Sequence, residues 1–320
     1  MVSTLTSRDF AEARATIDGL VHRTPLFSSR TLSDRTGFPV WLKAENLQKT
    51  GSFKPRGAFN KVRHLPRREL AQGVITASAG NHGQALAYVA AHEHIPGFVV
   101  MPVGANPSKI AAVRSYGAEA ILHGELWDDA YAHSQDLAMK RALVYVHPFR
   151  DRFILAGQGT VALEIVEEIP DVCAVVVPIG GGGLIAGMAM AFRELKPDVR
   201  IIGIEPAGSA NMLTSRQNGA PSDLASVTTI ADGLATRKTD PEMFEIINSL
   251  VDDLVAVTDA EILLAISFLL ERAKLLAEPA GAATVAALLA GKVVVRSGAK
   301  TVAVISGGNL DVSGRLKLAY

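Results

Sequence analysis

The sequence lacks the features that mark several protein classes. It has one cysteine, Cys173, in 320 residues, which excludes an internal disulfide framework and a CxxC metal site and fits a reducing compartment. No window reaches the roughly 18 uninterrupted apolar residues that a membrane span needs, and the N-terminus shows no apolar signal core. We therefore expect a cytoplasmic protein with no membrane partner.

An excess of charge of one sign is also missing. The 32 basic and 32 acidic residues cancel, so no global field would attract nucleic acid or an acidic surface. The hydrophobic content of 48% and the charged content of 20% are those of an ordinary globular protein. A chain of 320 residues is long for one compact core and suggests two domains.

Short apolar runs alternate with segments of helical periodicity along most of the chain. The runs that predict buried strands lie at 73–78, 97–101, 119–123, 173–178, 200–205 and 300–305. Two series of strand–helix units predict an α/β fold with two parallel sheets flanked by helices. We expect a small α/β domain at 49–146, inserted into a large domain made of 1–48 and 147–320.

Helical segments are less sharply bounded than the strands. The pattern predicts helices near 8–20, 58–62, 84–92, 108–116, 126–141, 157–168, 184–194, 241–249, 259–274 and 280–289. The stretch 206–238 is rich in loop-forming residues, and its pattern predicts no regular element.

The stretch from Lys49 to Gly57 contains an amine, Lys54, in an unusual local setting. Pro55 disfavours the α conformation at Lys54 and is favoured at the start of a helix, so Lys54 is expected at a loop-to-helix junction. The positive end of that helix, with Arg56 beside it, disfavours the ammonium form and predicts a lowered pKa. A neutral lysine is what Schiff-base chemistry requires. The alternative is an unperturbed surface lysine.

Four consecutive glycines, Gly180 to Gly183, stand between an apolar strand and a helix. Such a loop lets backbone N–H groups close round an anion at the helix N-terminus, and phosphate is its natural ligand. The loop also matches the dinucleotide fingerprint through Gly181, Gly183 and Ala186, with Glu205 where a ribose-binding acid is expected. That match would indicate a nicotinamide dehydrogenase, which leaves Lys54 without a role.

A phosphate on the glycines and an aldehyde on Lys54 both belong to pyridoxal phosphate, whose ring withdraws electrons. The sequence resembles the β-family (fold type II, tryptophan synthase β-like) pyridoxal-phosphate enzymes, and within them the threonine/serine dehydratase and serine racemase branch. It is most similar to short threonine dehydratases that lack a regulatory domain. The resemblance rests on KTGSFKPRG at 49–57, SAGNHGQ at 78–84, GGGG at 180–183, TIADG at 229–233 and SGGN at 306–309.

The resemblance implies a role for each residue that matches a family motif. The residues that it assigns to the cofactor are Phe53, Lys54, Asn81, Gly180, Gly181, Gly182, Gly183, Leu184 and Ser306. Those that it assigns to the substrate carboxylate are Ser78, Ala79, Gly80, Asn81 and His82. Lys54 would anchor the cofactor and later move protons as the free amine. For His82, a helix-cap or packing role without proton transfer is the alternative.

Ser306 would face the pyridine nitrogen of the cofactor. A neutral hydroxyl does not hold a proton on that nitrogen, so the ring would be a weaker electron sink, and a long-lived carbanion is disfavoured. The expected reaction is therefore α,β-elimination from a β-hydroxy amino acid. L-Threonine would give 2-oxobutanoate and L-serine would give pyruvate, each with ammonia. Dehydration of another β-hydroxy amino acid, such as threo-3-hydroxyaspartate, is an open alternative.

Serine racemase is the nearest competing activity. Racemisation needs a second acid opposite the lysine, and the family places a serine for this task directly after Ser78. This chain has Ala79 there, and a methyl group cannot donate a proton. A catalytically silent ligand-binding homologue is a further alternative.

The resemblance also implies a divalent cation, Mg²⁺ or Ca²⁺, near the strand that follows the glycine-loop helix. Glu205 matches one ligand, Ser209 could supply a carbonyl, and Asn211 stands where a second carboxylate is expected. An amide in place of a carboxylate weakens binding of a hard cation. A solvated carboxylate at the end of the strand is the alternative for Glu205. By resemblance, a homodimer or homotetramer is expected.

Overall fold

The computed structural model describes residues 5–311. Its α-helices are α1 (Ser7–Ile17), α2 (Arg30–Thr36), α3 (Lys54–Arg63), α4 (Arg67–Leu70), α5 (Asn81–His92), α6 (Pro107–Ser115), α7 (Trp127–Arg141), α8 (Arg152–Glu168), α9 (Gly183–Leu195), α10 (Asn211–Asn218), α11 (Pro241–Leu250), α12 (Asp259–Phe268) and α13 (Pro279–Leu289). Its strands are β1 (Leu26–Ser28), β2 (Val40–Lys43), β3 (Val74–Ala77), β4 (Gly97–Met101), β5 (Glu119–Leu122), β6 (Val144–Tyr145), β7 (Ala174–Pro178), β8 (Arg200–Pro206), β9 (Asp253–Val257) and β10 (Thr301–Val304).

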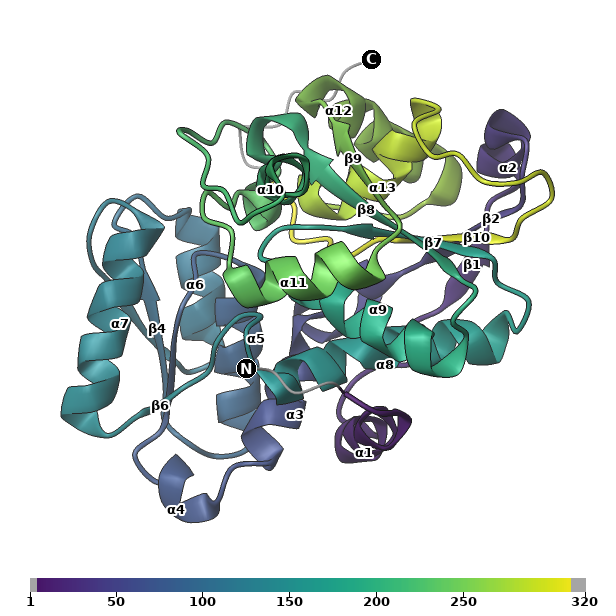
Figure 1. Cartoon of the computed structure of the whole chain (residues 1–320). Coiled ribbons are helices and arrows are strands. Elements are labelled where there is room, and N and C mark those ends of the chain that lie inside the picture. Colours follow the sequence, from purple (N-terminus) through teal and green to yellow (C-terminus); the bar gives the residue numbers. More distant parts are fainter. Residues whose placement is uncertain (1–4, 312–320) are drawn as a thin grey trace.

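The larger sheet has the strand order β1-β2-β10-β7-β8-β9. Only β1 runs antiparallel to its neighbour, and the pairs from β2 to β9 are all parallel. Helices α8, α9 and α11 lie on one face, and α12 and α13 cover the other (Figure 1). Because both faces are covered, the central strands are apolar throughout rather than alternating. The expected parallel sheet flanked by helices is confirmed.

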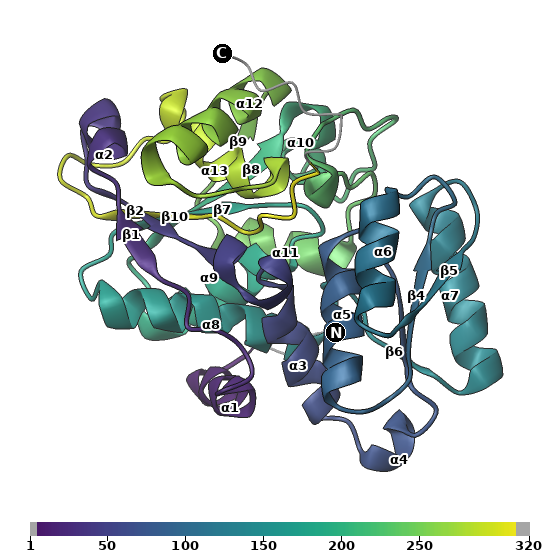
Figure 2. The ribbon, with the colours of Figure 1, turned by 180° about the vertical axis from the view of Figure 1, so that it is seen from behind.

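The smaller sheet has the order β5-β4-β3-β6, and all its pairs are parallel. Helices α5 and α6 lie on one face and α7 on the other, and the two sheets stand side by side in both views (Figures 1 and 2). All four strands fall inside 49–146. The division into two domains stays a prediction, because α3 packs against both α8 and α5.

Several elements differ from the expectations. Helix α8 begins at Arg152 rather than at 157, since the Asp151 carboxylate accepts hydrogen bonds from the backbone N–H groups of Phe153 and Ile154 at 2.8 and 3.2 Å. The loop-rich stretch 206–238 contains α10, which the sequence pattern does not reveal because α10 is polar along most of its length. The short β1 and α2 were not predicted either.

A cluster of buried charges fastens the start of α3 to the larger sheet. The Arg56 guanidinium is fully buried and pairs with the Glu45 carboxylate through Nη2 at 2.8 Å and with the Glu164 carboxylate through Nη1 at 2.6 Å. The Lys43 ammonium also reaches Glu164, at 2.6 Å. Burial alone would raise the pKa of Glu164, but Arg56 and Lys43 bring that pKa below its ordinary value.

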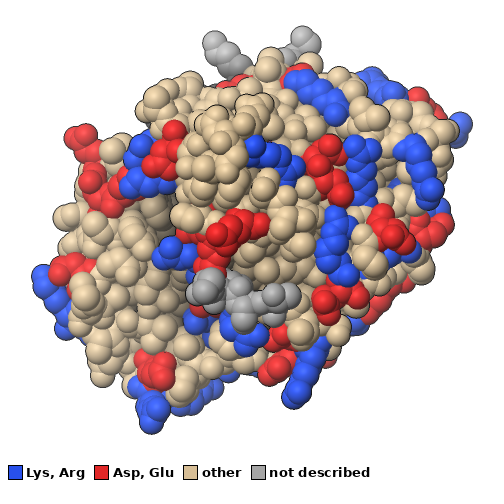
Figure 3. All heavy atoms as spheres, viewed as in Figure 1, with Lys and Arg blue, Asp and Glu red and all other residues tan. Residues whose placement is uncertain are grey.

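The surface shows a mixture of charges. Basic and acidic side chains alternate over the face seen in Figure 3, as the zero net charge predicts. Among residues 5–311, no helix combines the length and apolar character required to cross a bilayer.

We predict that Arg56→Met lowers the free energy of unfolding by about 3–5 kcal/mol, because it removes the cation that pairs with Glu45 and leaves Glu164 with Lys43. Denaturant unfolding followed by circular dichroism measures the loss. Arg30 is the control, since its pair with Asp34 is exposed at 3.9 Å, and Arg30→Met should cost about 0–1 kcal/mol. Equal losses in the two variants would contradict the prediction.

Candidate active site

Three motifs meet at one edge of the larger sheet. Strands β2, β10 and β7 are parallel neighbours, so their carboxyl ends lie together. The chain leaves β2 toward 49–57, β10 toward 306–309 and β7 toward 180–183. In open α/β sheets, ligands bind at this edge. The smaller sheet contributes the stretch 78–84, which follows β3.

Lys54 is the first residue of α3, so the helix starts one residue earlier than the proline rule predicts. Its Nζ donates a hydrogen bond to the Pro148 carbonyl at 3.0 Å and lies 5.1 Å from the centre of the Phe53 ring. Burial lowers the pKa of Lys54 from the ordinary 10.5 to about 8. The direction agrees with the prediction, and burial is its cause. Arg56 is not a cause, because its charge is compensated by its carboxylate partners.

His147 is a second titratable group whose pKa responds to burial and to the charge of Lys54. Burial lowers the pKa of Lys54 to about 8 and that of His147 to about 4, and each side chain keeps partial exposure. His147 Nδ1 accepts hydrogen bonds from the backbone N–H groups of Phe149 and Arg150, at 3.2 and 2.8 Å, which places the proton on Nε2.

The glycine loop is packed so tightly that larger residues would not fit. A Cβ on Gly181 or Gly183 would run into Phe149, and one on Gly180 would lie 2.9 Å from the Gly233 carbonyl oxygen. Gly182 has φ of +89°, a left-handed conformation that favours glycine. Helix α9 starts at Gly183, so its first N–H groups, with that of Leu184, are directed toward the loop. The arrangement suits a phosphate.

Ser306 follows β10 and is 4% exposed. The backbone around it pairs with the stretch that carries Lys54, since Phe53 N–H donates to the Ser306 carbonyl at 3.2 Å and Ser52 bridges to Gly307. The Ser306 hydroxyl makes only a long contact, 3.5 Å, with the Ala280 carbonyl. It is therefore a neutral group with hydrogen-bonding capacity to spare.

The stretch 78–84 begins as a turn and ends as a helix. Gly80 N–H donates to Ser78 Oγ at 3.2 Å, and α5 starts at Asn81, so the N–H groups at the helix start are available to a carboxylate. Ala79 and Gly80 keep partial exposure in this turn. His82 is 3% exposed, and its Nε2–H donates to the Val146 carbonyl at 3.0 Å.

Burial and the charge of Lys54 lower the pKa of His82 to about 3. The ring is therefore neutral at physiological pH and cannot serve as an acid there. These contacts fit the packing interpretation of His82.

Two residues near the site have roles that the sequence did not reveal. Asn81 Nδ2 donates to the Glu278 carboxylate at 2.5 Å, and Asn81 Oδ1 accepts from Asn309 Nδ2 at 2.8 Å. Asn309 belongs to a recognised motif, but its link to Asn81 was not expected. Glu278 directly precedes α13. An acid directly before Pro279, at a helix start that follows apolar chain, was the available signal.

The three residues proposed for a cation lie between the end of β8 and the start of α10, and the side chain of each has protein partners. The amide of Asn211 contacts Thr239 Oγ1 at 2.9 Å. Both Glu205 oxygens accept backbone N–H groups, from Met212 at 2.9 Å and Leu213 at 2.7 Å, so Glu205 holds the start of α10. Ser209 Oγ donates to the carbonyls of Leu234 and Thr236. Among residues 5–311, no group of three or more His, Cys, Asp or Glu side chains forms a cage for a metal. The cation stays a prediction.

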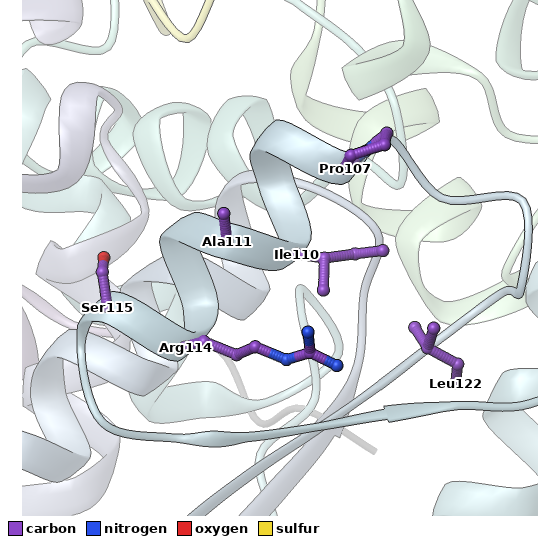
Figure 4. Close-up of a pocket in the computed structure, with 6 residues that line it drawn as sticks. All are labelled: Pro107, Ile110, Ala111, Arg114, Ser115 and Leu122. Atoms are coloured by element: carbon purple, nitrogen blue, oxygen red, sulfur yellow. The ribbon is translucent and has the colours of Figure 1, made fainter.

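A hollow of about 550 Å³ lies elsewhere, on the outer side of the smaller sheet between α6 and β5. Figure 4 shows Ile110 and Arg114 of α6 extending toward Leu122 of β5. None of the residues assigned to the cofactor or the substrate lines it. We assign no role to this hollow.

Known proteins resemble this chain over most of its length. The family described as pyridoxal-phosphate dependent enzyme matches residues 17–307. The chain belongs to this family. It is 47% identical over 309 residues to an L-threonine ammonia-lyase from Thermotoga maritima, covering 97% of this chain and 77% of that protein. It is 41% identical over 306 residues to the catabolic L-threonine dehydratase TdcB of Escherichia coli, covering 95% and 93%.

Two solved structures of similar shape are named as a serine racemase and a threonine deaminase. Maize serine racemase aligns with a TM-score of 0.93 at 35% identity, covering 97% of this chain and 95% of that one. The processed form of threonine deaminase isoform 2 from Solanum lycopersicum aligns with a TM-score of 0.90 at 37% identity, covering 96% and 90%. The fold type II pyridoxal-phosphate architecture is thus shown, and the dehydrogenase interpretation of the glycine loop is wrong.

The residues present fit pyridoxal 5′-phosphate, the cofactor of this family. The glycine loop leaves no room for side chains and presents backbone donors, which suits the phosphate. The lowered pKa of Lys54 favours the free amine that an aldehyde requires. Ser306 offers a neutral hydroxyl for the ring nitrogen. When bound, the cofactor supplies the electron sink for loss of the substrate α-proton.

We predict that capture of pyridoxal phosphate by the apoprotein rises with pH about a midpoint near 8. The amine reacts only when neutral, and burial makes it neutral above that pH instead of above 10.5. Stopped-flow absorbance measures the rate, with free Nα-acetyl-lysine as the reference. A midpoint near the reference value would show that Lys54 is unperturbed.

Proposed function

We propose that the protein is an L-threonine ammonia-lyase that converts L-threonine to 2-oxobutanoate and ammonia, and L-serine to pyruvate and ammonia. The single observation that carries this is a lysine with a lowered pKa beside a neutral hydroxyl, Ser306, and a phosphate loop. The names of the relatives from Thermotoga maritima and Escherichia coli support the same activity. Dehydration of threo-3-hydroxyaspartate is the alternative that the same chemistry would allow.

In this proposal, the protein's own groups bind the substrate and move one proton. Backbone N–H groups in the stretch from Ser78 to His82 hold the substrate carboxylate at the start of α5. The Ser78 N–H is not among them, because it donates to the Val100 carbonyl at 3.0 Å. Lys54 Nζ, freed from the cofactor, accepts the α-proton. The Pro148 carbonyl accepts a hydrogen bond from Nζ at 3.0 Å and so holds the free amine in position. Ser306 would face the ring nitrogen of the bound cofactor with a neutral hydroxyl, and the cofactor would supply the electron sink and, through its phosphate, the acid with which the β-hydroxyl leaves as water.

Serine racemase is the second candidate, because maize serine racemase has nearly the same fold. The residue that argues against it is Ala79. A racemase requires a proton donor on the cofactor face opposite Lys54, and Ala79 has none to give. His82 cannot take over this role, because its pKa of about 3 leaves the ring without a labile proton at neutral pH.

Location, assembly and metal binding complete the proposal. We propose a cytoplasmic homodimer or homotetramer, by similarity to the family. Each Glu205 oxygen accepts one backbone N–H from the start of α10, so a Mg²⁺ or Ca²⁺ ion there would have to bind through the remaining lone pairs. Burial raises the pKa of Glu205 to about 7, which further disfavours the ionised form that a hard cation needs.

Lys54→Ala should abolish release of 2-oxobutanoate from threonine and also abolish the visible absorbance of the bound cofactor, because one amine serves both tasks. Oxo-acid assays on threonine, serine and threo-3-hydroxyaspartate, with and without divalent metal, measure the first effect. The matched control is Lys49→Ala in the same motif, which should keep both properties. Turnover by the Lys54 variant would contradict the proposal.

Ala79→Ser should raise formation of D-serine from L-serine by at least about tenfold, because it introduces the missing proton donor. Chiral chromatography measures the product, and Ala79→Gly is the control that adds no donor. The unmodified enzyme should make pyruvate faster than D-serine. The opposite ratio would identify the protein as a racemase.

A further inference from the structure

Glu278 is a buried acid that the proposed reaction leaves without a role. It precedes α13 and is 2% exposed. Its carboxylate accepts the 2.5 Å hydrogen bond from Asn81 Nδ2, and its backbone N–H donates to the Gly307 carbonyl at 3.1 Å. A Cβ on Gly307 would run into the carboxylate, so only glycine allows the loop after Ser306 to lie this close. Glu278 thus touches two of the cofactor motifs.

A directed chain of hydrogen bonds runs through the amide of Asn81. It starts at the Thr50 backbone carbonyl, which can only accept and takes a hydrogen bond from Asn309 Nδ2 at 2.8 Å. Asn309 Nδ2 also donates to Asn81 Oδ1, again at 2.8 Å. Asn81 must therefore present Nδ2 at its other side, where Glu278 accepts. Reversing the Asn81 amide would set oxygen against oxygen at Glu278 and N–H against N–H at Asn309.

This pinning leaves one hydrogen of Asn81 Nδ2 uncommitted. Nδ2 carries two hydrogens, and one of them is directed at Glu278. Asn81 keeps partial exposure, so the second hydrogen can reach a ligand. A hydroxyl or phenolate oxygen on the cofactor ring is the acceptor that such a fixed donor fits.

The charges around Glu278 come from elements of both sheets. The pKa of Glu278 is raised to about 7, with burial as the largest cause and Asp232 of the 232–234 turn adding to it, while Lys109 of α6 and the hydrogen bond from Asn81 act in the lowering direction. Lys109 and Asp232 form an ion pair with each other. Their opposite effects leave Glu278 without a strong charge partner, and the hydrogen bond from Asn81 becomes its principal polar contact. These contacts indicate that the Glu278 carboxylate serves as the hydrogen-bond acceptor for Asn81.

We propose that Glu278 is a positioning residue for the reaction: it fixes the amide of Asn81 so that the second Nδ2–H is presented to the cofactor's ring oxygen. Glu278 itself touches neither substrate nor reacting atoms. The inference rests on the proposed assignment of Asn81 to the cofactor. If the inference is right, the effect of Glu278 on the cofactor passes through Asn81. Position 278 then needs only an oxygen acceptor at the right distance from the Asn81 amide.

The test is a double-mutant cycle read out on cofactor binding. Glu278→Met removes the acceptor at similar volume and should weaken pyridoxal phosphate binding by about tenfold while shifting the visible absorbance of the bound cofactor. In an Asn81→Ala background, the same change should have less than about a twofold effect. Equal effects in both backgrounds, or no effect in the unmodified background, would overturn the proposal.

Two conservative variants test the need for an acceptor, and they apply also if Glu278→Met does not fold. Glu278→Gln keeps an oxygen at the same reach and should stay within about threefold of the unmodified affinity, with its spectrum unchanged. Glu278→Asp keeps the charge but withdraws it by one methylene, so it should show the spectral shift and a loss of about fivefold or more. An unchanged spectrum and affinity in Glu278→Asp, or a large loss of affinity in Glu278→Gln, would overturn the proposal.

Activity is measured separately so that the two proposals can fail independently. The spectrum and affinity of the bound cofactor require no turnover. If the unmodified enzyme released no oxo acid from any β-hydroxy amino acid, the proposed function would be wrong, while the cycle on Asn81 would still decide the role of Glu278.

Discussion

The buried pairing of Arg56 with Glu45 and Glu164 is the constraint on which the site depends. Arg56 lies two residues after Lys54, so any movement of the guanidinium would carry the amine with it. An unpaired charge in this interior would be very costly, and the pairing therefore admits one placement of α3 against α8 and β2. Lys54 is thus held at the start of α3 by buried groups other than those assigned to the cofactor.

The second constraint is the seam between the two sheets. The larger sheet provides the phosphate loop and Ser306, and the smaller sheet provides the stretch that starts α5. Contacts across the seam include the pair of Lys109 with Asp232 and the bond from Asn309 to Asn81. The residues assigned to the cofactor and the substrate thus come from both sheets, and they meet where the sheets meet.

The sequence predicted those features that depend on local pattern. The strands after 73, 97 and 173 and the glycine loop follow from apolar runs and from glycine chemistry. What it could not predict depends on distant partners. Helix α10 is polar and starts where Glu205, a residue of β8, accepts its N–H groups. The neighbouring Arg56 seemed to lower the pKa of Lys54, but its carboxylate partners cancel that charge.

Burial drives the titratable groups of the site toward their neutral forms. The pKa of Lys54 falls to about 8 and that of His82 to about 3, while that of Glu278 rises to about 7, each with desolvation as the largest cause. Side chains in their neutral forms contribute little fixed charge to the site. The main anions there would be the cofactor phosphate and the substrate carboxylate. Two helix starts, those of α9 and α5, have backbone N–H groups that would suit a phosphate and a carboxylate. Because these donors do not titrate, any pH dependence of anion binding would come from the ligands and from neighbouring side chains such as Lys54.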